Sequence, residues 1–402
     1  MRLRAAGRGG STTSGENRSM GHVSIQDIKL EGDFQGTDFN LRVFRFGERR
    51  AGAPKIYMHA ALHADETPGM LILHHLLPRL QAAAEAGQIP GEVVVLPQAN
   101  PLGGAQVLFR DKHVGRFHLP NGENHNRGWA LLTEDVIETI GAGLGADALA
   151  NVALIRRVVG EALAAREPVT VLDRYRKAIL GLCYDADMVW DLHCDDDSGR
   201  HLFIIPEQWP DWKDIAAASR SMVALTAADS GGGSFDECLS TVWTRLQARF
   251  PEHPIPLACP SATFEYAGWA DVEDSVAAED AQHLFSILCS RGFVNAEATP
   301  LPALEAEGLP LEATEMLRIS SPGIIAYHVR IGEQVRRGQH VADVVDPTVL
   351  DPAEARTPVL AGTDGFVLSR LMQKLVFPGD CVMKIVGREI LEEREGGYLL
   401  QD

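Results

Sequence analysis

The amino-acid sequence predicts an α/β domain with a largely parallel sheet, followed by a small all-β domain. Between about residues 22 and 300, short apolar runs alternate with longer helical patterns, which is the order typical of a parallel sheet covered on both faces. After residue 312 the chain becomes rich in β-branched residues and glycine and loses its helical period. At 402 residues, 45% of them hydrophobic and 23% charged, the chain has the composition of a folded protein of two or three domains.

Each predicted strand is a continuous apolar run, which is typical of strands that are buried on both faces. They are expected at residues 55–58, 92–96, 188–192, 201–205 and 262–266. The predicted helices share apolar residues at helical spacing. They are expected at residues 68–86, 147–165, 215–228 and 272–291. Thr67 can cap the first of these helices, and Pro68 fits its first turn.

The domain boundaries follow from changes of composition. We expect a disordered leader at 1–20, the α/β domain at 21–300, a Pro/Glu/Ala-rich linker at 301–312, the β-domain at 313–390 and a tail at 391–402. Inside the β-domain, the pattern of residues 321–339 returns at 361–382, with glycines at similar positions. Two similar β-halves predict one small barrel or sandwich.

Charge and cysteine usage exclude several classes of protein. The formal net charge is −18, from 55 acidic and 37 basic residues, and no basic stripe is present, so a nucleic-acid partner is not expected. No apolar run approaches about 18 residues, and the basic N-terminus lacks the apolar segment of a signal peptide. We therefore expect a cytoplasmic protein without a membrane partner. The six cysteines form no CxxC pair and are expected to be reduced.

Three candidate metal ligands each follow a predicted strand. His63 and Glu66 lie between the strand at 55–58 and the next helix, and His193 comes directly after the strand at 188–192. Two imidazoles and one carboxylate leave a fourth tetrahedral position for water, which is typical of a catalytic zinc site. Asp191 lies on the same strand face as His193 and could orient its imidazole. Taken alone, His63 and Glu66 are explained equally well as a polar loop.

Further candidates for chemistry lie later in the α/β domain. Glu265 is a carboxylate within an apolar strand, where burial favours a raised pKa and a role in proton transfer. A Glu paired with a basic neighbour or exposed at a strand edge is an equal alternative. Arg127 beside Asn126 could grip a carboxylate with its guanidinium fork, although simple surface exposure is the alternative for each.

Together these residues carry a resemblance to a known family. The motifs are H-A-D-E at 63–66, A-N-P-L-G at 99–103, N-H-N-R at 124–127, D-L-H at 191–193 and T-F-E at 263–265. In this order they resemble the zinc carboxypeptidase superfamily, and most closely its succinylglutamate desuccinylase/aspartoacylase branch, over about residues 50–300. The implied fold is a mixed, mostly parallel sheet with helices on both faces.

The C-terminal half-repeat resembles the biotinyl/lipoyl carrier domain and the C-terminal module of many members of the same branch. In the carriers, the modified lysine lies on the hairpin between the two halves. Here the corresponding residues 346–357 contain no lysine. We therefore expect a structural cap or an assembly module and not a carrier, and a homo-oligomer is allowed.

The resemblance implies a role for each matching residue. It implies one zinc ion per chain, held by His63, Glu66 and His193, with Glu265 as general base and then general acid. It also implies that Asn126 and Arg127 bind a substrate carboxylate. The family uses an upstream arginine to polarise the scissile carbonyl. Arg116 is the candidate for this role, and Arg110 is the alternative.

The implied activity is that of a zinc-dependent amidohydrolase, a deacylase that cleaves the linear amide of a small N-acyl amino acid. A metallocarboxypeptidase acting on peptide C-termini is the alternative, and a non-catalytic scaffold is a third and less favoured one. Asn124 stands where the branch commonly has Asp, and Gly128-Trp129 replaces its usual turn. These two departures bear on the identity of the substrate and not on the zinc chemistry. The acidic run 195–197 is either a solvated turn or a site for a second, cationic amine of the substrate.

Overall fold

The computed structural model describes residues 18–20, 23–110, 112–129, 133–395 and 399. Most of the expected leader therefore lies outside the described residues, and its last three residues form strand β1. Of the expected tail, a 3-10 turn at Glu392–Arg394 is described, and Leu399 donates its backbone N–H to Ser230 O at 2.9 Å.

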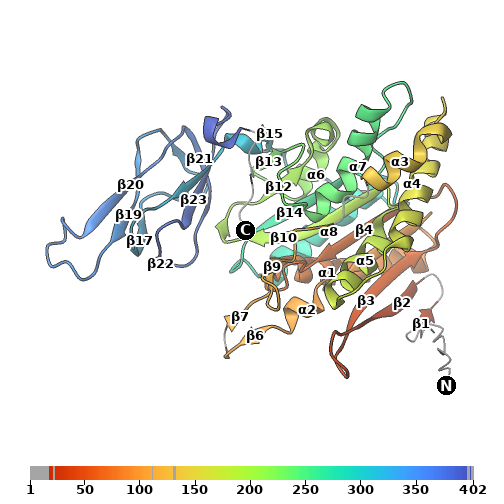
Figure 1. Ribbon diagram of the computed structural model, residues 1–402, viewed down its shortest axis with the longest axis horizontal. Coiled ribbons are helices and arrows are strands. Elements are labelled where there is room, and N and C mark those ends of the chain that lie inside the picture. Colours follow the sequence, from red (N-terminus) through yellow and green to blue (C-terminus); the bar gives the residue numbers. More distant parts are fainter. Residues whose placement is uncertain (1–17, 21–22, 111, 130–132, 396–398, 400–402) are drawn as a thin grey trace, which may run out of the picture.

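The fold confirms the predicted mixed α/β class. Figure 1 shows one large twisted sheet with helices on both faces and a separate β-sandwich beside it. The large sheet has the order β1-β2-β3-β5-β4-β10-β14-β12-β13-β15. In this order its strands are Arg18–Met20, Val23–Glu31, Asp38–Gly47, Glu92–Leu96, Lys55–Ala60, Met188–Asp195, Ser261–Gly268, His201–Ile204, Val223–Thr226 and Glu307–Pro310. The central strands β5, β4, β10 and β14 are parallel, so their carboxyl ends meet at one edge.

Two hydrophobic cores hold the helices on the sheet because side chains alternate along its buried strands. Ile56 and Met58 of β4 face one core, and Tyr57 between them faces the other. The first core receives α1 (Pro68–Glu85), α6 (Lys213–Ala218) and α8 (Asp274–Ser290). The second receives α3 (Thr133–Ile140), α4 (Ala148–Ala165), α5 (Val171–Cys183) and α7 (Phe235–Arg249).

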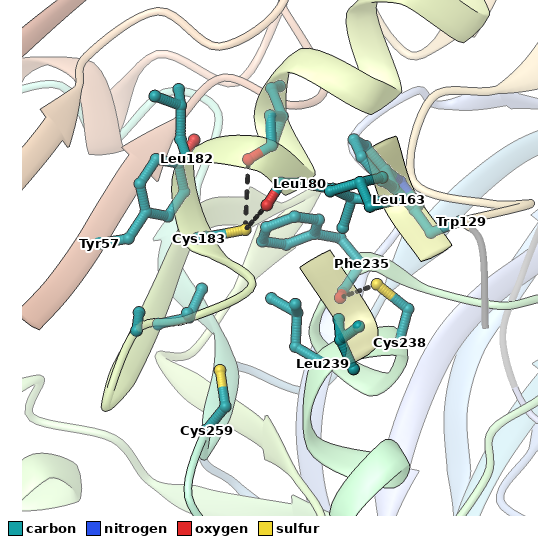
Figure 2. Close-up of a cluster of buried hydrophobic side chains, with 14 of the residues drawn as sticks. Tyr57, Trp129, Leu163, Leu180, Leu182, Cys183, Phe235, Cys238, Leu239 and Cys259 are labelled. Atoms are coloured by element: carbon teal, nitrogen blue, oxygen red, sulfur yellow. Dashed lines mark hydrogen bonds between the residues drawn. The ribbon is translucent and has the colours of Figure 1, made fainter. Parts of the chain in front are cut away.

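The second core contains three of the six cysteines. Figure 2 shows Cys183, Cys238 and Cys259 among buried side chains that include Tyr57 and Phe235. The thiols of Cys183 and Cys238 donate to backbone carbonyls of their own helices, and burial raises the pKa of both thiols. All six cysteines are free, in agreement with the expected reduced state.

Some predictions of local structure were wrong. The helix expected at 215–228 ends at Ala218, and the following apolar run forms the buried strand β13. A short apolar run fits a helix or a buried strand equally well, so its periodicity could not separate the two. Pro68 does occupy the first turn of α1, but the Thr67 side chain makes no capping hydrogen bond. Helices α5 and α7 and the β2–β3 hairpin were not predicted.

The C-terminal residues form two small sheets that share an apolar core. One sheet has the order β11-β21-β23-β16, with β18 paired to β21, and the other has the order β20-β19-β17-β22. Their strands are β11 Asp197–Ser198, β16 Thr314–Arg318, β17 Gly323–Tyr327, β18 Gln334–Val335, β19 His340–Val345, β20 Arg356–Leu360, β21 Gly365–Arg370, β22 Leu375–Val376 and β23 Cys381–Val386. Residues 346–355 connect β19 to β20.

The β-sandwich is attached to the large sheet by backbone pairing. Strand β11, which follows β10 directly, adds to β21 as an antiparallel neighbour, with Asp197 opposite Arg370. Part of the segment expected as a linker is also structured, because β15 pairs with β13 at the edge of the large sheet. This attachment places the β-sandwich at the carboxyl end of β10. None of the described helices is both long and apolar enough to cross a membrane.

Candidate metal centre and pocket

The loop after β4 is held in place by two neighbouring segments. Ala61 turns the chain with a φ of 60°, a conformation that L-residues rarely adopt. The side chain of Asn100, which precedes the short helix α2 (Pro101–Gly104), donates to the carbonyl of Leu62 at 2.8 Å. The carbonyl of Gly115 accepts from Ala64 N–H at 3.1 Å. These bonds fix the backbone on both sides of His63.

His193 reaches the same place from β10, the strand beside β4. The first turn of α1 packs tightly on this strand, because a Cβ at Gly69 would lie 2.7 Å from Cβ of Leu192. Only glycine allows this close approach. The backbone N–H of Cys194 also donates to Glu66 Oε2 at 3.2 Å. His193 therefore meets Glu66 although the two residues lie 127 positions apart in the chain.

The three predicted ligands form one buried group. Glu66 lies between the two imidazoles, with Oε1 2.8 Å from His63 Nδ1 and Oε2 2.7 Å from His193 Nδ1. The imidazole rings are nearly perpendicular, with centroids 4.9 Å apart. All three residues are at most 3% exposed. Their ligand atoms lie within 4.8 Å of one another and could hold a metal ion.

The outer nitrogen of each imidazole faces an oxygen acceptor. His63 Nε2 lies 2.8 Å from Asn124 Oδ1, and His193 Nε2 lies 2.8 Å from Asp191 Oδ2, where strand alternation predicts it. Asp191 Oδ1 is in turn 2.7 Å from His59 Nε2, and His59 Nδ1 is 3.0 Å from the Tyr57 hydroxyl. Such outer contacts fix the tautomer and orientation of ligand imidazoles.

The charges of the group are set by burial and by one another. Burial and the nearby Arg116 guanidinium lower the pKa of His63 to about 4, which favours a neutral imidazole. Burial opposes ionisation of Glu66, yet the two imidazoles hold its pKa below the usual value. Burial also opposes protonation of His193, but the carboxylates of Asp191 and Glu66 raise its pKa well above the usual value.

These residues fit a divalent cation such as zinc. Two imidazole nitrogens and one carboxylate form the donor set of many catalytic zinc sites. His193 lies between the two buried carboxylates of Asp191 and Glu66, and a cation on its Nδ1 side would compensate their negative charge. Among the described residues, no lysine or arginine lies closer to the buried carboxylate of Glu66 than Arg116, whose Nη1 is 3.4 Å away.

Glu265 lies on β14 directly beside His193 in the parallel register. It borders the same pocket, and its Oε2 is buried without a hydrogen-bond partner among the described residues. Burial, and then the negative charge of Glu66, raise the pKa of Glu265 to about 8. A carboxyl group in this state can exchange a proton near neutral pH.

The two predicted substrate-binding residues, Asn126 and Arg127, are fixed by loop contacts. The amide oxygen of Asn126 accepts from Phe235 N–H at 2.8 Å, at the start of α7. Arg127 Nη1 donates to the Asn126 carbonyl at 2.7 Å, and both residues border the pocket. Arg116 also borders it, beside His63 and Glu66. Arg110 does not border it and lies exposed at the end of the β6 (Val107–Leu108) and β7 (Lys112–His113) hairpin.

The pocket has a volume of about 300 Å³ and is closed on one side by the β-sandwich. Lys384 of β23 borders it and binds Asp195 Oδ2 at 2.5 Å. Arg370 of β21 likewise binds Asp197. Two members of the acidic run are therefore paired with cations of the β-sandwich. Only Asp196 of this run has no ion pair within the described residues, and burial raises its pKa to about 6.

Sequence reasoning missed three parts of the site. His59 is not among the sequence candidates, yet two-residue alternation along β4 puts it on the Tyr57 face, opposite Asp191. Lys384 gave no sequence signal, because its role depends on how the β-sandwich docks. Asp236 and Glu237 lie in the first turn of α7 and border the pocket. This helix was not predicted. His125 is buried and does not border the pocket, and burial and His118 lower its pKa to about 3.

Comparison with known proteins confirms the resemblance. Residues 52–127 match the family model of the succinylglutamate desuccinylase/aspartoacylase catalytic domain. This segment contains His63, Glu66, Arg116, Asn126 and Arg127. No curated protein matches the chain in sequence.

Solved structures share the fold over nearly the whole chain. A succinylglutamate desuccinylase/aspartoacylase of Shewanella frigidimarina NCIMB 400 has a TM-score of 0.81 at 20% identity and covers 91% of this chain and 98% of its own. A protein of the same family from Shewanella amazonensis SB2B has a TM-score of 0.78 at 21% identity, covering 90% and 98%. The product-bound ectoine utilization protein EutE (DoeB) of Ruegeria pomeroyi has a TM-score of 0.63 at 15% identity, covering 93% and 98%.

Proposed function

We propose that this chain, which resembles the succinylglutamate desuccinylase/aspartoacylase family in sequence over residues 52–127 and in fold over about nine-tenths of its length, is a zinc-dependent deacylase of small N-acyl amino acids. One observation carries the proposal. The buried group of His63, Glu66 and His193 borders a pocket of about 300 Å³, and the protonatable Glu265 lies on the strand beside His193.

The chemistry is divided among named side chains. His63, Glu66 and His193 would hold the zinc ion, which when bound supplies Lewis acidity and a nucleophilic water near neutral pH. Glu265 accepts a proton from the attacking water and later donates one to the departing amine nitrogen. Arg116, whose guanidinium lies at the same end of the pocket, stabilises the negative charge that develops on the scissile carbonyl oxygen. Water and amide are consumed, and a carboxylic acid and a free amine are released.

The remaining pocket favours a small anionic substrate. Arg127 offers a guanidinium for a carboxylate, and the Asn126 backbone is braced so that the loop keeps its shape. A volume of about 300 Å³ suits an acylated amino acid, and Lys384 and Asp195 close the wall toward the β-sandwich. This closure supports a small substrate over a peptide C-terminus.

The proposal is tested by amine release from zinc-loaded protein. The panel contains N-acetyl and N-succinyl amino acids together with short peptides. We expect release from at least one acyl amino acid and a loss of about 10²- to 10⁴-fold in kcat for Glu265→Gln, because proton transfer is removed while the shape is kept. Glu161→Gln is the matched control, since Glu161 is an exposed helix residue paired with Arg157.

The outcomes separate the alternatives. Release from peptides alone would make the protein a metallocarboxypeptidase. Equal rates for wild type and Glu265→Gln would remove Glu265 from the reaction. No release from any compound, with zinc bound at His63, Glu66 and His193, would contradict a deacylase of this substrate class and favour a non-catalytic scaffold.

A further inference from the structure

A second group of metal-ligating side chains lies in the β-sandwich, away from the pocket. It consists of His328, His340 and Asp343, and we call it the His328–His340–Asp343 cluster. Their ligand atoms lie within 4.8 Å of one another. His328 follows β17, and the other two residues belong to β19, the neighbouring strand (Figure 1).

A strand irregularity brings the three side chains together. Strands β17 and β19 are antiparallel, with Tyr327 opposite Ala342, and His328 N–H continues the ladder to Val341 O at 2.9 Å. In regular alternation, His340 and Asp343 would point to opposite faces of β19. The register of β19 against β20 shifts between His340 and Ala342. This bulge re-aims the His340 side chain toward Asp343.

The distances show a carboxylate between two imidazoles. His340 Nε2 lies 2.7 Å from Asp343 Oδ1, and His328 Nε2 lies 3.0 Å from Asp343 Oδ2. The carboxylate is nearly covered, with 8% of its side chain exposed, whereas the imidazoles are 48% and 40% exposed. A cation could therefore reach the cluster from solvent without any movement of the backbone.

The cluster has the same arrangement as the group in the pocket. In both, one carboxylate places each of its oxygens on a different imidazole nitrogen. The two rings are steeply inclined in both, with centroids 4.7 Å apart and an angle of 68° in the cluster, against 4.9 Å and 85° in the pocket. The difference lies in exposure, because the pocket group is buried and the cluster is open.

We propose that His328, His340 and Asp343 form a second, solvent-accessible binding site for a divalent transition-metal ion such as zinc. Imidazole nitrogens and a carboxylate oxygen are ligands that zinc accepts, and water fills the remaining positions. The site is independent of the deacylase activity, since its residues belong to the β-sandwich and none of them borders the pocket.

The guanidinium of Arg356 competes with a metal ion for the carboxylate of this site. Its Nη1 binds Asp343 Oδ2 at 3.0 Å from the neighbouring strand β20, on the oxygen that His328 also faces. Two cations near one carboxylate repel each other, so removal of the guanidinium strengthens metal binding. From the repulsion of unit charges about 4 Å apart in water, we expect Arg356→Gln to raise zinc affinity about fivefold per unit of metal charge.

The test counts zinc ions bound per full-length chain by equilibrium dialysis and elemental analysis. We expect two in the wild type and one in the His328→Gln/His340→Gln variant, which removes both imidazoles from exposed positions. His75→Gln is the matched control, because His75 Nε2 lies 2.8 Å from Asp274 Oδ1 in a surface pair that has no third ligand among the described residues. We expect this control variant to bind two zinc ions per chain, as the wild type does.

Equal zinc stoichiometry in the wild type and the double variant, with unchanged circular dichroism, would overturn the proposal. A lower zinc affinity in Arg356→Gln than in the wild type would also overturn the proposal, because the cluster would then serve to bind Arg356 and not a metal ion. Failure of the deacylase proposal leaves this experiment unaffected. If the double variant keeps amine release, or keeps one tightly bound zinc ion, the ion that it has lost came from the cluster and not from the pocket.

Discussion

Asp195 and Lys384 are 189 residues apart in the chain and form an ion pair of 2.5 Å at the wall of the pocket. Asp195 ends β10, the strand that carries His193, and Lys384 belongs to β23 of the β-sandwich. Both side chains are less than one-fifth exposed. The pair thus joins the β-sandwich to the edge of the large sheet at which the candidate metal ligands lie.

Lys384→Met is expected to destabilise the protein because it leaves the Asp195 carboxylate largely buried without its cation. Burial opposes ionisation of Asp195, and Lys384 is the first cause that holds its pKa down at about 2. Loss of one partner should lower the free energy of unfolding by about 2 kcal/mol, and Asp195→Asn in the same chain should restore part of it. Urea denaturation measures both variants.

Arg157→Gln is the matched control for this cycle, because Arg157 and Glu161 form a pair that is 59% exposed on both sides. It should change the free energy of unfolding by less than about 0.5 kcal/mol. Additive effects of Lys384→Met and Asp195→Asn would show that the two residues do not interact in solution.

Asn124→Asp is expected to tighten zinc binding. Asn124 Oδ1 accepts from the outer nitrogen of His63, and its Nδ2 has no hydrogen-bond partner among the described residues, so aspartate loses no bond. A carboxylate there makes the imidazole a stronger donor, and we expect about a tenfold gain in zinc affinity in a chelator competition. Asn121→Asp changes the same charge at an exposed position of the loop and should have no effect. Equal affinities of both variants would contradict a role of Asn124 behind His63.

We infer that His59 is a positioning residue, because it contacts Asp191 and not the candidate metal ligands themselves. His59→Phe leaves Asp191 Oδ1 without its buried partner, and we expect zinc affinity to fall about tenfold. His59→Gln should recover most of this loss, since its amide can donate to the same oxygen. A purely structural role would instead lower thermal stability in His59→Phe and leave the zinc affinity of the folded protein unchanged.

Asp236→Asn tests a pH dependence of stability. Burial, and then the charge of Glu237, raise the pKa of Asp236 from 3.8 to about 7. Between these values the folded chain binds more protons than the unfolded chain, so this group lowers the free energy of unfolding as pH rises from about 4 to 7. The variant should gain stability over the wild type, from near zero at about pH 4 to about 2 kcal/mol at pH 8. A difference that is the same at both pH values would contradict this assignment.

The sequence predicts the central strands and the metal-ligand candidates because both depend on short, local patterns. Residues 63–66 follow the buried strand β4, and residues 191–193 lie in the carboxyl-terminal half of its parallel neighbour β10. The carboxyl ends of such strands meet at one edge. That rule brings His63, Glu66 and His193 together without any knowledge of the helices. The resemblance adds Glu265, which register places beside His193.

Features that depend on long-range packing could not be predicted in this way. The contact of Lys384 with Asp195 requires the docking of β11 on β21, which no local pattern encodes. The apolar run of β13 follows a short helix and has no polar alternation, because the two faces of this strand pack in different apolar cores. The bulge at His340 likewise depends on the register of β20 and not on its own sequence.

We propose that His63, Glu66 and His193 hold the catalytic metal ion. Anomalous diffraction at the zinc edge from crystals of the zinc-loaded protein tests this assignment. We expect a strong peak about 2.0–2.2 Å from Nδ1 of both histidines and from a carboxylate oxygen of Glu66, with Glu265 facing it across the pocket. A fully zinc-loaded crystal without a peak between these three side chains would contradict it.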